Sequence, residues 1–355
     1  MDQFKILYNR YLHNNNPYID WEKVEILDEI SLKHYDEIPF PDNTTVENIG
    51  KKICMIKLNG GLGTTMGCTG PKSMLKVKHD LTFMDIILEQ NNLTLDTPLV
   101  LMNSFYTNDQ TEFFLKNNQH KHNIDITTFC QNKFPRIIKD TNQYHESSDN
   151  IDYFYPPGHG DLLQSLNDTR VLKKIIDQGI EYLFISNIDN LGGTLDYKIA
   201  SQLVNSDIDF AIELTPKTEL DIKGGTLIKY DGKYKMFEVA QCPPEKLSEF
   251  MSIDKFKYFN TNNIWIKVSS ITKLLETNYT DSIDLIINPK KLKDGRECIQ
   301  LEYAIGSMVK FFDKVVCFNV SRDRFIPVKT NNDLELLRSD KYQIDKKTWK
   351  LIKSE

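Results

Sequence analysis

A glycine-rich segment, KLNGGLGTTMGCTGPKS at residues 57–73, follows directly on the apolar run Ile53-Cys54-Met55-Ile56. An apolar run that ends in glycines is typical of a buried strand followed by a loop. Glycines let backbone amides come close to phosphate oxygens, because no Cβ stands between them. Lys72 would add a positive charge for the same anion. The segment therefore predicts a phosphate-binding loop at the end of a strand.

Two common phosphate-binding loops are excluded by their spacing. A Walker loop needs glycine directly before lysine, and Pro71 separates Gly70 from Lys72. The dinucleotide pattern G-x-G-x-x-G, begun at Gly61, fails because its third glycine comes one residue late. A flexible surface turn is the alternative, but strand, glycines and lysine follow the order that an anion site requires. A kinase or a dehydrogenase is therefore not expected.

The rest of the chain indicates an α/β fold with a mixed, mostly parallel sheet. Apolar runs at Leu99–Met102 and Tyr182–Ile185 also end in polar residues, and residues 162–176 have apolar side chains at helical spacing. Continuous apolar strands that alternate with helices are typical of parallel sheets covered on both faces. Residues 226–239, with the turn Asp231-Gly232, predict an antiparallel hairpin. We expect this insertion to form a wall for a second substrate.

Changes in the pattern of polar and apolar residues along the chain predict its domains. Residues 1–45 predict a polar, helical lead-in that closes at the proline-containing linker Ile38–Asp42. Residues 46–330 contain the alternating strands and helices and predict a single domain. Residues 331–355 predict a short helical tail around Leu334 and Leu337.

The composition excludes several classes of protein. With 40% hydrophobic and 26% charged residues, the 355-residue chain is typical of a globular protein. The formal charge of -6 and the pI near 5.7 argue against nucleic acid as a partner. The six cysteines form no C-x-x-C pair, which favours reduced thiols in a cytoplasmic protein. No run reaches the ~20 apolar residues of a membrane helix, and the start lacks a signal-peptide core, so no membrane partner is expected.

Glycines flank a histidine in a second loop, Tyr155-Pro156-Pro157-Gly158-His159-Gly160-Asp161. The prolines stiffen the entry, and the glycines expose the backbone on both sides of the histidine. We expect His159 to contact a ligand rather than to be an ordinary loop histidine, since loops on a rigid scaffold often carry function. Asp161 is predicted to be the N-cap of the helix that follows.

A third segment, Ser186-Asn187-Ile188-Asp189-Asn190, follows an apolar run, at the strand end where open α/β sheets bind ligands. A carboxylate beside a triphosphate is a common ligand of Mg²⁺, which makes Asp189 a candidate. The alternative is an Asx turn, which explains one such side chain better than Asn187 and Asp189 together. Later in the chain, Glu238 and Asn262 suit sugar hydroxyls and Lys329 suits a phosphate, but each of these signals is weak alone.

In their order and spelling these segments resemble the eukaryotic-type UTP–glucose-1-phosphate uridylyltransferases, also called UDP-glucose pyrophosphorylases. The resemblance implies a Rossmann-like nucleotidyltransferase catalytic domain over residues 46–330, with an antiparallel sugar-binding insertion. It further implies transfer of the uridylyl group of UTP to glucose 1-phosphate, with Mg²⁺ as cofactor, giving UDP-glucose and pyrophosphate. The matching motifs lie at residues 57–73, 101–105, 155–161, 186–191, 223–226, 259–263 and 327–330.

The resemblance also implies a role for individual residues. The contacts implied for UTP are Leu58, Asn59, Gly60, Gly61, Lys72 on the phosphates, Gln131 on the uracil and Gly158 on the base or ribose. The contacts implied for glucose 1-phosphate are His159 and Asn187, with Gly225, Glu238 and Asn262 on the sugar hydroxyls. Asp189 would bind Mg²⁺, and Lys72 and Lys329 would be the catalytic lysines.

The chain departs from the family pattern in its length. Cellular members typically continue into a C-terminal β-helix domain, whereas this chain ends at Glu355, shortly after Lys329. We therefore expect a short form that is a monomer or a small homo-oligomer. Two alternatives stay open, a uridylyltransferase for another sugar 1-phosphate and a non-catalytic nucleotide-sugar sensor. Lys72, Asp189 and Lys329 argue against a sensor, which does not need cations beside a leaving group.

Overall fold

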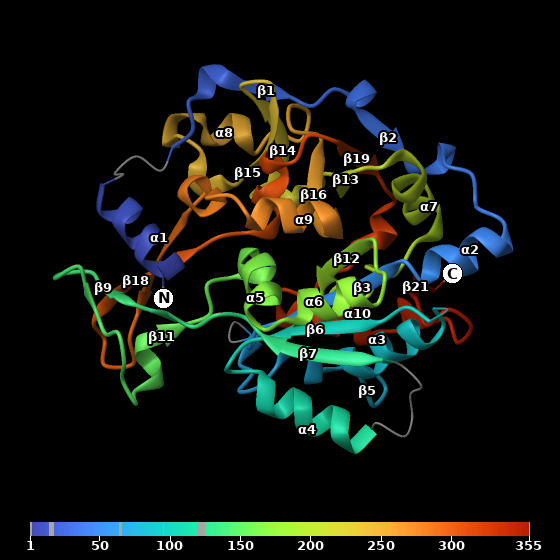
Figure 1. Ribbon diagram of the computed structural model, residues 1–355, viewed down its shortest axis with the longest axis horizontal. Helices are drawn as coiled ribbons and strands as arrows, with labels where there is room; N and C mark the ends of the chain where they lie inside the picture. The colour runs from blue at the N-terminus through green and yellow to red at the C-terminus, as the bar shows by residue number, and fades with distance from the viewer. Residues whose placement is uncertain (1, 14–17, 64–65, 95, 119–124, 355) are drawn as a thin grey trace.

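The central sheet confirms the predicted mixed, mostly parallel α/β fold. The computed structural model describes residues 2–13, 18–63, 66–94, 96–118 and 125–354. Within these residues the sheet has eight strands in the order β2-β19-β13-β16-β12-β3-β6-β7 (Figure 1). Only β16 is antiparallel to its neighbours in this described sheet. The strands are β2 Leu32–His34, β3 Ile53–Asn59, β6 Leu99–Asn103, β7 Ile126–Cys130, β12 Tyr182–Asn187, β13 Phe210–Pro216, β16 Tyr258–Lys267 and β19 Val315–Asn319.

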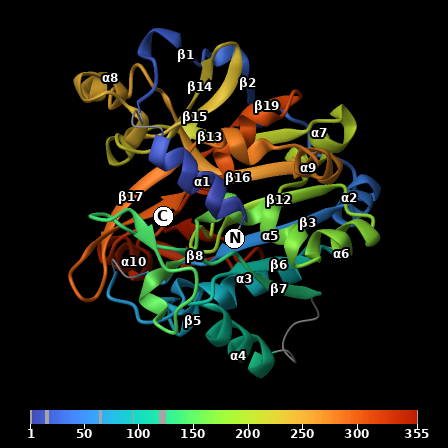
Figure 2. The same cartoon turned by 60° about the vertical axis from the view of Figure 1, so that its left-hand side comes forward.

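The strands of the central sheet are largely apolar because both faces of the sheet are covered. In β3, Cys54 and Ile56 belong to one buried cluster, and Ile53 and Met55 belong to the other. This alternation follows from the two-residue period of a strand. The first cluster includes residues of α1, α5, α6 and α9, and the second includes residues of α2, α3, α7 and α10 (Figure 2). The helices are α1 Asp2–His13, α2 Asn43–Gly50, α3 Phe83–Asn92, α4 Asn108–Asn118, α5 Leu162–Asp168, α6 Val171–Asp177, α7 Tyr197–Ser206, α8 Leu247–Phe250, α9 Val268–Leu275 and α10 Asn331–Arg338.

The helix expected over residues 162–176 is divided into two. α5 ends at Asp168, α6 begins at Val171, and Arg170 between them has a φ of 62°. A left-handed residue cannot continue a right-handed helix, so the chain breaks there. The sequence predicted one helix because apolar positions continue across the break, with Leu166 and Val171 in the same buried cluster.

The predicted hairpin is confirmed as β14, Thr226–Tyr230, and β15, Lys233–Phe237. Its turn residues Asp231 and Gly232 have φ values of 50° and 75°, which the tight turn requires. β1, Val24–Ile26, extends this hairpin to a sheet of three described strands. The other strands outside the central sheet are β4 Lys76–Lys78, β5 Leu81–Thr82, β8 Phe134–Pro135, β9 Ile137–Ile138, β10 Gln143–Tyr144, β11 Phe154–Tyr155, β17 Ile286–Lys291, β18 Glu297–Glu302, β20 Tyr342–Ile344 and β21 Leu351–Lys353.

Both ends of the chain contain strands as well as helices. The lead-in has the expected helix in α1, but β1 pairs with β14, and β2 lies at the edge of the central sheet beside β19. The tail begins with the expected helix α10 and then forms the hairpin β20–β21. Strands of three residues are too short to show a two-residue period, so the sequence could not reveal them.

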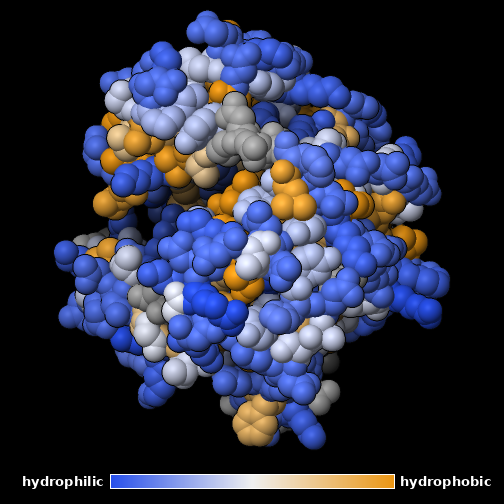
Figure 3. Space-filling model, turned by 90° about the vertical axis from the view of Figure 1, so that its left-hand side faces the viewer, coloured by the Kyte–Doolittle hydropathy of each residue, from blue (hydrophilic) through white to orange (hydrophobic). Residues whose placement is uncertain are grey.

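The side of the molecule that carries α1 and β9 is mostly hydrophilic, with small scattered apolar patches (Figure 3). Among the described helices, none is both long and apolar enough to cross a bilayer. All six cysteines are free thiols.

Candidate active site

The loops after four neighbouring parallel strands lie along one edge of the central sheet. In β12 and β3, Asn187 lies opposite Leu58, and in β3 and β6, Asn59 lies opposite Asn103. β7 ends beside Asn103, so Gln131 follows at the same edge. Ligands of open α/β sheets bind outside the carboxyl ends of the strands. The fold therefore brings the predicted nucleotide-binding residues together.

The glycine loop packs tightly against the Gln131 side chain. A Cβ at Gly60 would lie 2.2 Å from Nε2 of Gln131, so a larger residue would displace that amide. The backbone N–H of Gln131 donates to the Asn103 carbonyl at 2.9 Å, and the Ser104 hydroxyl donates to the Gly60 carbonyl at 2.8 Å. Gln131 is 8% exposed, and within the described chain its buried Oε1 accepts no hydrogen bond. A buried acceptor without a partner suits a donor on a ligand.

The side chains of Leu58 and Asn59 are buried beneath this loop. Leu58 is 9% exposed and Asn59 is fully buried. Nδ2 of Asn59 donates to Oδ1 of Asn103 at 2.8 Å and to Oγ1 of Thr111 at 3.0 Å. Only the main chain of these two residues can therefore meet a nucleotide. Gly61 accepts a hydrogen bond from the Lys72 backbone at 3.1 Å, which closes the loop.

The predicted catalytic lysine Lys72, the predicted metal ligand Asp189 and the segment that leads to Lys329 lie together. Nζ of Lys72 donates to Oδ2 of Asp189 at 2.5 Å and also to the Val328 carbonyl, which precedes Lys329. The side chains of Lys72 and Asp189 are only 15% and 13% exposed, so solvent screens this ion pair less than a surface pair. Three segments that are far apart in sequence meet at this point.

The residues predicted for the sugar also form contacts with one another. Nδ2 of Asn262 donates to Oδ1 of Asn187 at 2.9 Å, which joins β16 to the end of β12. A Cβ at Gly225 would lie 2.3 Å from the Glu238 carboxylate, so the start of the hairpin lies directly against its end. Burial raises the pKa of Glu238, and the positive charge of Lys329 opposes that shift. The Nζ of Lys329 lies 5.5 Å from the centroid of the Phe259 ring.

His159 lies in a constrained loop. Gly158 before it has a φ of 93°, which favours glycine. Nδ1 of His159 accepts a hydrogen bond from the Ile305 backbone at 3.1 Å, so the neutral ring carries its proton on Nε2. Burial lowers the pKa of His159 to about 4, and the ring is therefore neutral at neutral pH. Ligand contact by this N–H stays a prediction.

Asp161 is not the side-chain N-cap that the sequence predicted. It begins α5, but its carboxylate makes no capping hydrogen bond and is fully buried. The turn His159–Asp161 is already helical, with Asp161 itself at φ -66° and ψ -8°, so the extended geometry of an N-cap is absent at this residue. The carboxylate accepts instead from the Asn132 backbone at 2.6 Å and from the Tyr303 hydroxyl at 2.8 Å.

One functional candidate that the sequence analysis did not include is Lys57. It lies in β3 and is 1% exposed, and its Nζ donates to Oγ of Ser186 at 2.7 Å and to the Gly193 carbonyl at 2.5 Å. Burial, with the nearby charge of Arg324, lowers the pKa of Lys57 to about 7, while Asp189 opposes the shift. A lysine between an apolar run and the glycine loop was the available signal.

A buried ion pair was also missed. Arg324 donates to the Glu213 carboxylate through Nε at 2.6 Å and through Nη2 at 2.7 Å. Trp265 donates to the same carboxylate at 3.0 Å. Nη2 of Arg324 also donates to the Thr194 carbonyl at 3.0 Å. A glutamate within the apolar run of β13 was the signal in the sequence.

Asn190 joins the Asp189 loop to the segment that leads to Lys329. Nδ2 of Asn190 donates to the Arg324 carbonyl at 3.0 Å, and its Oδ1 accepts from the Ile326 backbone at 2.9 Å. The side chain is fully buried. These contacts fix the two segments that carry the predicted metal ligand and the second catalytic lysine.

The site suits a metal that arrives with a nucleotide. Within the described ranges, no group of three or more His, Cys, Asp or Glu side chains could hold a metal ion. Mg²⁺ bound to a triphosphate needs few protein ligands, because phosphate and water oxygens fill most positions. Asp189 at the edge of the sheet, beside the Lys72 ammonium, fits that limited role.

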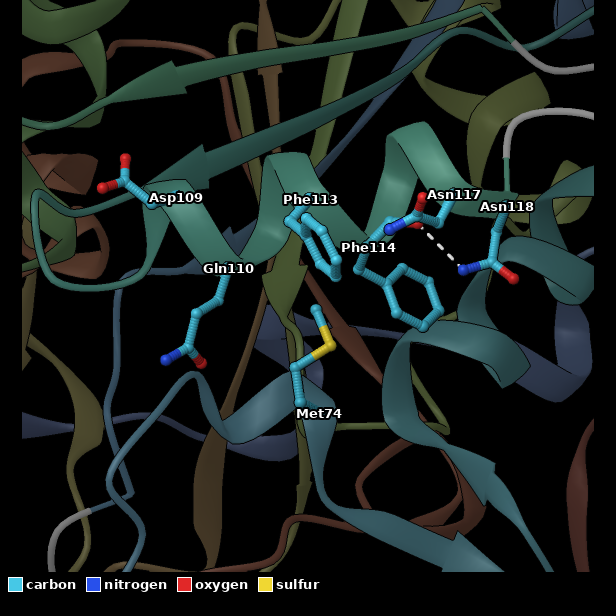
Figure 4. Close-up of a pocket in the computed structure, with 7 residues that line it drawn as sticks. All are labelled: Met74, Asp109, Gln110, Phe113, Phe114, Asn117 and Asn118. Carbon is cyan, nitrogen blue, oxygen red and sulfur yellow. Dashed lines mark hydrogen bonds between the residues drawn. The ribbon is translucent and has the colours of Figure 1, made fainter.

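A separate pocket of about 480 Å³ lies outside this site, between α4 and the segment after the glycine loop. Phe113 and Phe114 of α4 extend toward Met74 in this pocket (Figure 4). None of the predicted site residues lines it. The glycine loop does touch α4, since a Cβ at Gly70 would lie 2.2 Å from Oε1 of Gln110.

A mostly parallel α/β sheet with a glycine loop and the Lys72–Asp189 ion pair at its carboxyl edge is the arrangement expected of a nucleotidyltransferase. The chain belongs to the UTP–glucose-1-phosphate uridylyltransferase family, whose sequence model matches residues 1–355.

Relatives and solved structures agree with this assignment. UTP–glucose-1-phosphate uridylyltransferase 2 of Dictyostelium discoideum is 41% identical over 351 residues, or 96% of this chain and 69% of that protein. The enzyme of the same name from Astragalus penduliflorus is 43% identical, over 95% of this chain and 73% of its own. UDP-glucose phosphorylase of Trypanosoma brucei has a TM-score of 0.88 and 34% identity, over 99% of this chain and 78% of that one. UDP-glucose pyrophosphorylase of Leishmania major, solved in open and closed structures, has a TM-score of 0.86 and 29% identity with the same coverage.

Proposed function

We propose that this protein transfers the uridylyl group of UTP to glucose 1-phosphate and thereby forms UDP-glucose and pyrophosphate. The observation that carries the proposal is the meeting of Lys72, Asp189 and the Val328-Lys329 segment at the carboxyl edge of the sheet. Membership of the family and the names of the relatives support the same reaction.

The chemistry needs positioning and positive charge more than proton transfer. A phosphate oxygen of glucose 1-phosphate attacks the α-phosphorus of UTP in line, and pyrophosphate leaves. The attacking oxygen is already anionic near neutral pH, so no general base is required. The enzyme has to bring polyanions together and to stabilise charge on the transferring group.

The phosphate side of the site supplies these charges. Lys72 is held beside the sheet edge by Asp189 and by the Val328 carbonyl. Lys329 is the next residue after Val328. The glycine loop adds backbone amides, which approach phosphate closely. Asp189 would hold Mg²⁺, which neutralises phosphate charge when bound.

The two ends of UDP-glucose are recognised on either side of the phosphates. Gln131, against Gly60, reads the uracil, with Gly158 beside the base or ribose. The glucose 1-phosphate side consists of His159, Asn187, Gly225, Glu238 and Asn262. We place the protein in the cytoplasm as a monomer or a small homo-oligomer, which light scattering coupled to size-exclusion chromatography would measure.

The test is pyrophosphate release by the purified protein with UTP and a panel of sugar 1-phosphates, with and without EDTA. Release that requires glucose 1-phosphate and is abolished by EDTA is expected. Equal release with galactose 1-phosphate or N-acetylglucosamine 1-phosphate would keep the chemistry but reject glucose specificity. A folded protein that binds UTP and releases no pyrophosphate would instead be a nucleotide-sugar sensor.

Lys329→Ala is the matched variant for this assay. Lys329 is exposed, so its removal should leave the melting temperature unchanged while kcat falls ~10²–10³-fold through loss of a charge at the phosphates. Lys353→Ala, which removes another exposed lysine from the tail, is the control and should keep wild-type kcat.

A further inference from the structure

We propose that Asp161 is a positioning residue for base specificity, because it ties the segment that carries Gln131 to the loop that carries Gly158. The inference rests on the proposed function, in which Gln131 reads the uracil. It assigns Asp161 a role that differs from the helix cap predicted from the sequence.

Four donors converge on the Asp161 carboxylate, which is fully buried. Oδ1 accepts from Nδ2 of Asn132 at 3.1 Å and from the Tyr303 hydroxyl at 2.8 Å. Oδ2 accepts from the backbone N–H of Asn132 at 2.6 Å and from the Ser165 hydroxyl. Burial raises the pKa of Asp161, and these hydrogen bonds oppose the shift. A buried carboxylate with this many donors has a fixed position.

Tyr303 extends the contact to the glycine-flanked loop. Its carbonyl accepts from the Gly160 backbone at 2.9 Å, and its N–H donates to the Pro157 carbonyl at 3.2 Å. A Cβ at Gly158 or Gly160 would lie 3.0 Å or 2.7 Å from that same carbonyl oxygen, so the loop lies directly on the Tyr303 backbone. The Asp161 carboxylate therefore holds the residue on which this loop rests.

The same carboxylate fixes the backbone next to Gln131. The backbone N–H of Gln131 is fixed by the Asn103 carbonyl, and the next N–H, that of Asn132, is fixed by Asp161. On the other side the Gln131 amide lies against Gly60. The main chain is thus held on both sides of a side chain whose buried Oε1 lacks a partner in the described chain.

A fixed amide can distinguish uracil from cytosine. Uracil presents an N–H at N3 and a carbonyl at C4, whereas cytosine presents an acceptor at N3 and an amino group at C4. A primary amide held in place matches the uracil edge, because its oxygen accepts from N3–H and its NH2 donates to the C4 carbonyl. On cytosine the amide oxygen would face the N3 acceptor and the amide NH2 would face the amino group. Discrimination of this kind is lost when the amide can move or rotate, because a flexible amide matches either edge.

Asp161→Asn is the sharpest test, because it keeps the volume and exchanges one acceptor for a donor. The remaining oxygen can accept from the backbone N–H of Asn132, and the hydroxyls of Ser165 and Tyr303 can rotate to accept, but the new amino group would face Nδ2 of Asn132, which is also a donor. We expect kcat/KM for UTP relative to CTP to fall roughly tenfold, as for one disturbed buried hydrogen bond. Tyr303→Phe removes one donor to the carboxylate and should lower the same ratio by a smaller factor.

Asp168→Asn is the matched control. Asp168 is exposed and lies 3.5 Å from Nδ2 of the same Asn132, so its replacement should leave the UTP to CTP ratio at the wild-type value. Thermal melting of each variant separates loss of fold from loss of discrimination. If Asp161→Asn does not fold, Tyr303→Phe decides the question.

Folded variants with a wild-type UTP to CTP ratio would overturn the inference and leave Asp161 with a structural role alone. Direct binding of UTP and CTP gives the ratio without turnover. Wild-type protein that prefers UTP in binding but releases no pyrophosphate would reject the proposed function, and the variants would still test the role of Asp161. Wild-type protein without any preference would overturn the inference.

Discussion

Lys72 and Asp189, which lie 117 residues apart in the chain, form an ion pair of 2.5 Å at the carboxyl edge of the central sheet. The parallel order of β12 and β3 brings their two loops together. The Lys72 ammonium also reaches the carbonyl next to Lys329. A predicted phosphate ligand and a predicted metal ligand therefore hold one another in place before substrate binds.

Asp189→Asn should lower kcat/KM by ~10²–10³-fold and raise the Mg²⁺ concentration needed for half activation. The change removes a charge but keeps the shape, and Lys72 retains the Val328 carbonyl as a partner, so the melting temperature should change little. Pyrophosphate release against Mg²⁺ concentration measures both effects. Asp80→Asn breaks the exposed pair with Lys76 and is the control. An unaltered Mg²⁺ dependence in Asp189→Asn would remove this residue from the metal site.

Lys57→Met should raise the melting temperature while lowering kcat. The Lys57 ammonium is buried and donates to a hydroxyl and a carbonyl rather than to a carboxylate. A buried ammonium carries a desolvation cost that an apolar side chain of similar volume does not have. Activity should fall because the Ser186–Gly193 loop, which carries Asp189, loses its hydrogen bonds to the Lys57 ammonium. Lys51→Met at an exposed position is the control, and a destabilised Lys57→Met with wild-type kcat would contradict both expectations.

The stability advantage of Lys57→Met should depend on pH. The unfolded chain binds a proton at Lys57 up to its ordinary pKa of 10.5, whereas the folded protein releases that proton at about pH 7. The unfolded state thus binds more protons between these values, and the wild-type free energy of unfolding rises with pH across this window. The gap between variant and wild type should be widest below pH 7 and should narrow as the pH rises. Urea denaturation at several pH values measures this gap.

Arg324→Met should lower the free energy of unfolding by about 3–5 kcal/mol, because it leaves the Glu213 carboxylate buried without its cation. The double variant Glu213→Leu/Arg324→Met should recover much of the stability. Activity should stay low in both, since the contact from Arg324 to Thr194 is lost. Arg338→Met breaks a part-exposed pair with Glu335 and should change stability by about 0–1 kcal/mol. Equal losses in the Arg324 and Arg338 variants would contradict a special role for the buried pair.

His159→Gln should reduce the loss of folding stability that occurs as the pH falls from 6.5 toward 4. Folded His159 has a pKa of about 4, below its ordinary value of 6.5, so the unfolded state binds more protons between these pH values. Stability is therefore lost as the pH falls from 6.5 toward 4. Glutamine can still accept from the Ile305 backbone and does not titrate. Melting temperatures from pH 4 to pH 7 test this, with exposed His145→Gln as the control. Identical slopes for wild type and His159→Gln would refute the lowered pKa.

Sequence alone could predict the elements whose signal is local. The apolar run in β3, the Asp231-Gly232 turn and the glycine loop each have a pattern within a few residues, and each is where the sequence predicted it. The grouping of Lys72 with Asp189 also follows, because parallel strands end at one edge. Three-residue strands such as β2 carry too little pattern to be recognised.

Tertiary contacts determine what the sequence could not reveal. Aspartate before a helix is a common N-cap, so the sequence predicted that role for Asp161. The hydrogen bonds from Asn132 and Tyr303 give its carboxylate another role. Lys57 resembles a surface lysine until β12 and the Gly193 loop cover it. Such residues are defined by partners that are distant in the sequence, 29 positions away in the Asn132 to Asp161 contact and 129 in the Lys57 to Ser186 contact.

The order of the strands along the chain separates most of the residues proposed for the nucleotide from most of those proposed for the sugar. β3, β6 and β7, which precede β12, end at the loops proposed to hold the nucleotide, whereas β16 and the two ends of the β14–β15 hairpin, which follow it, carry Asn262, Gly225 and Glu238, which are proposed for the sugar. Of the residues proposed for glucose 1-phosphate, only His159 precedes Asn187 in the chain. Exchange of the part after Asn187 between homologues should therefore carry most of the proposed sugar contacts with it, while the loops proposed for the nucleotide donor stay the same.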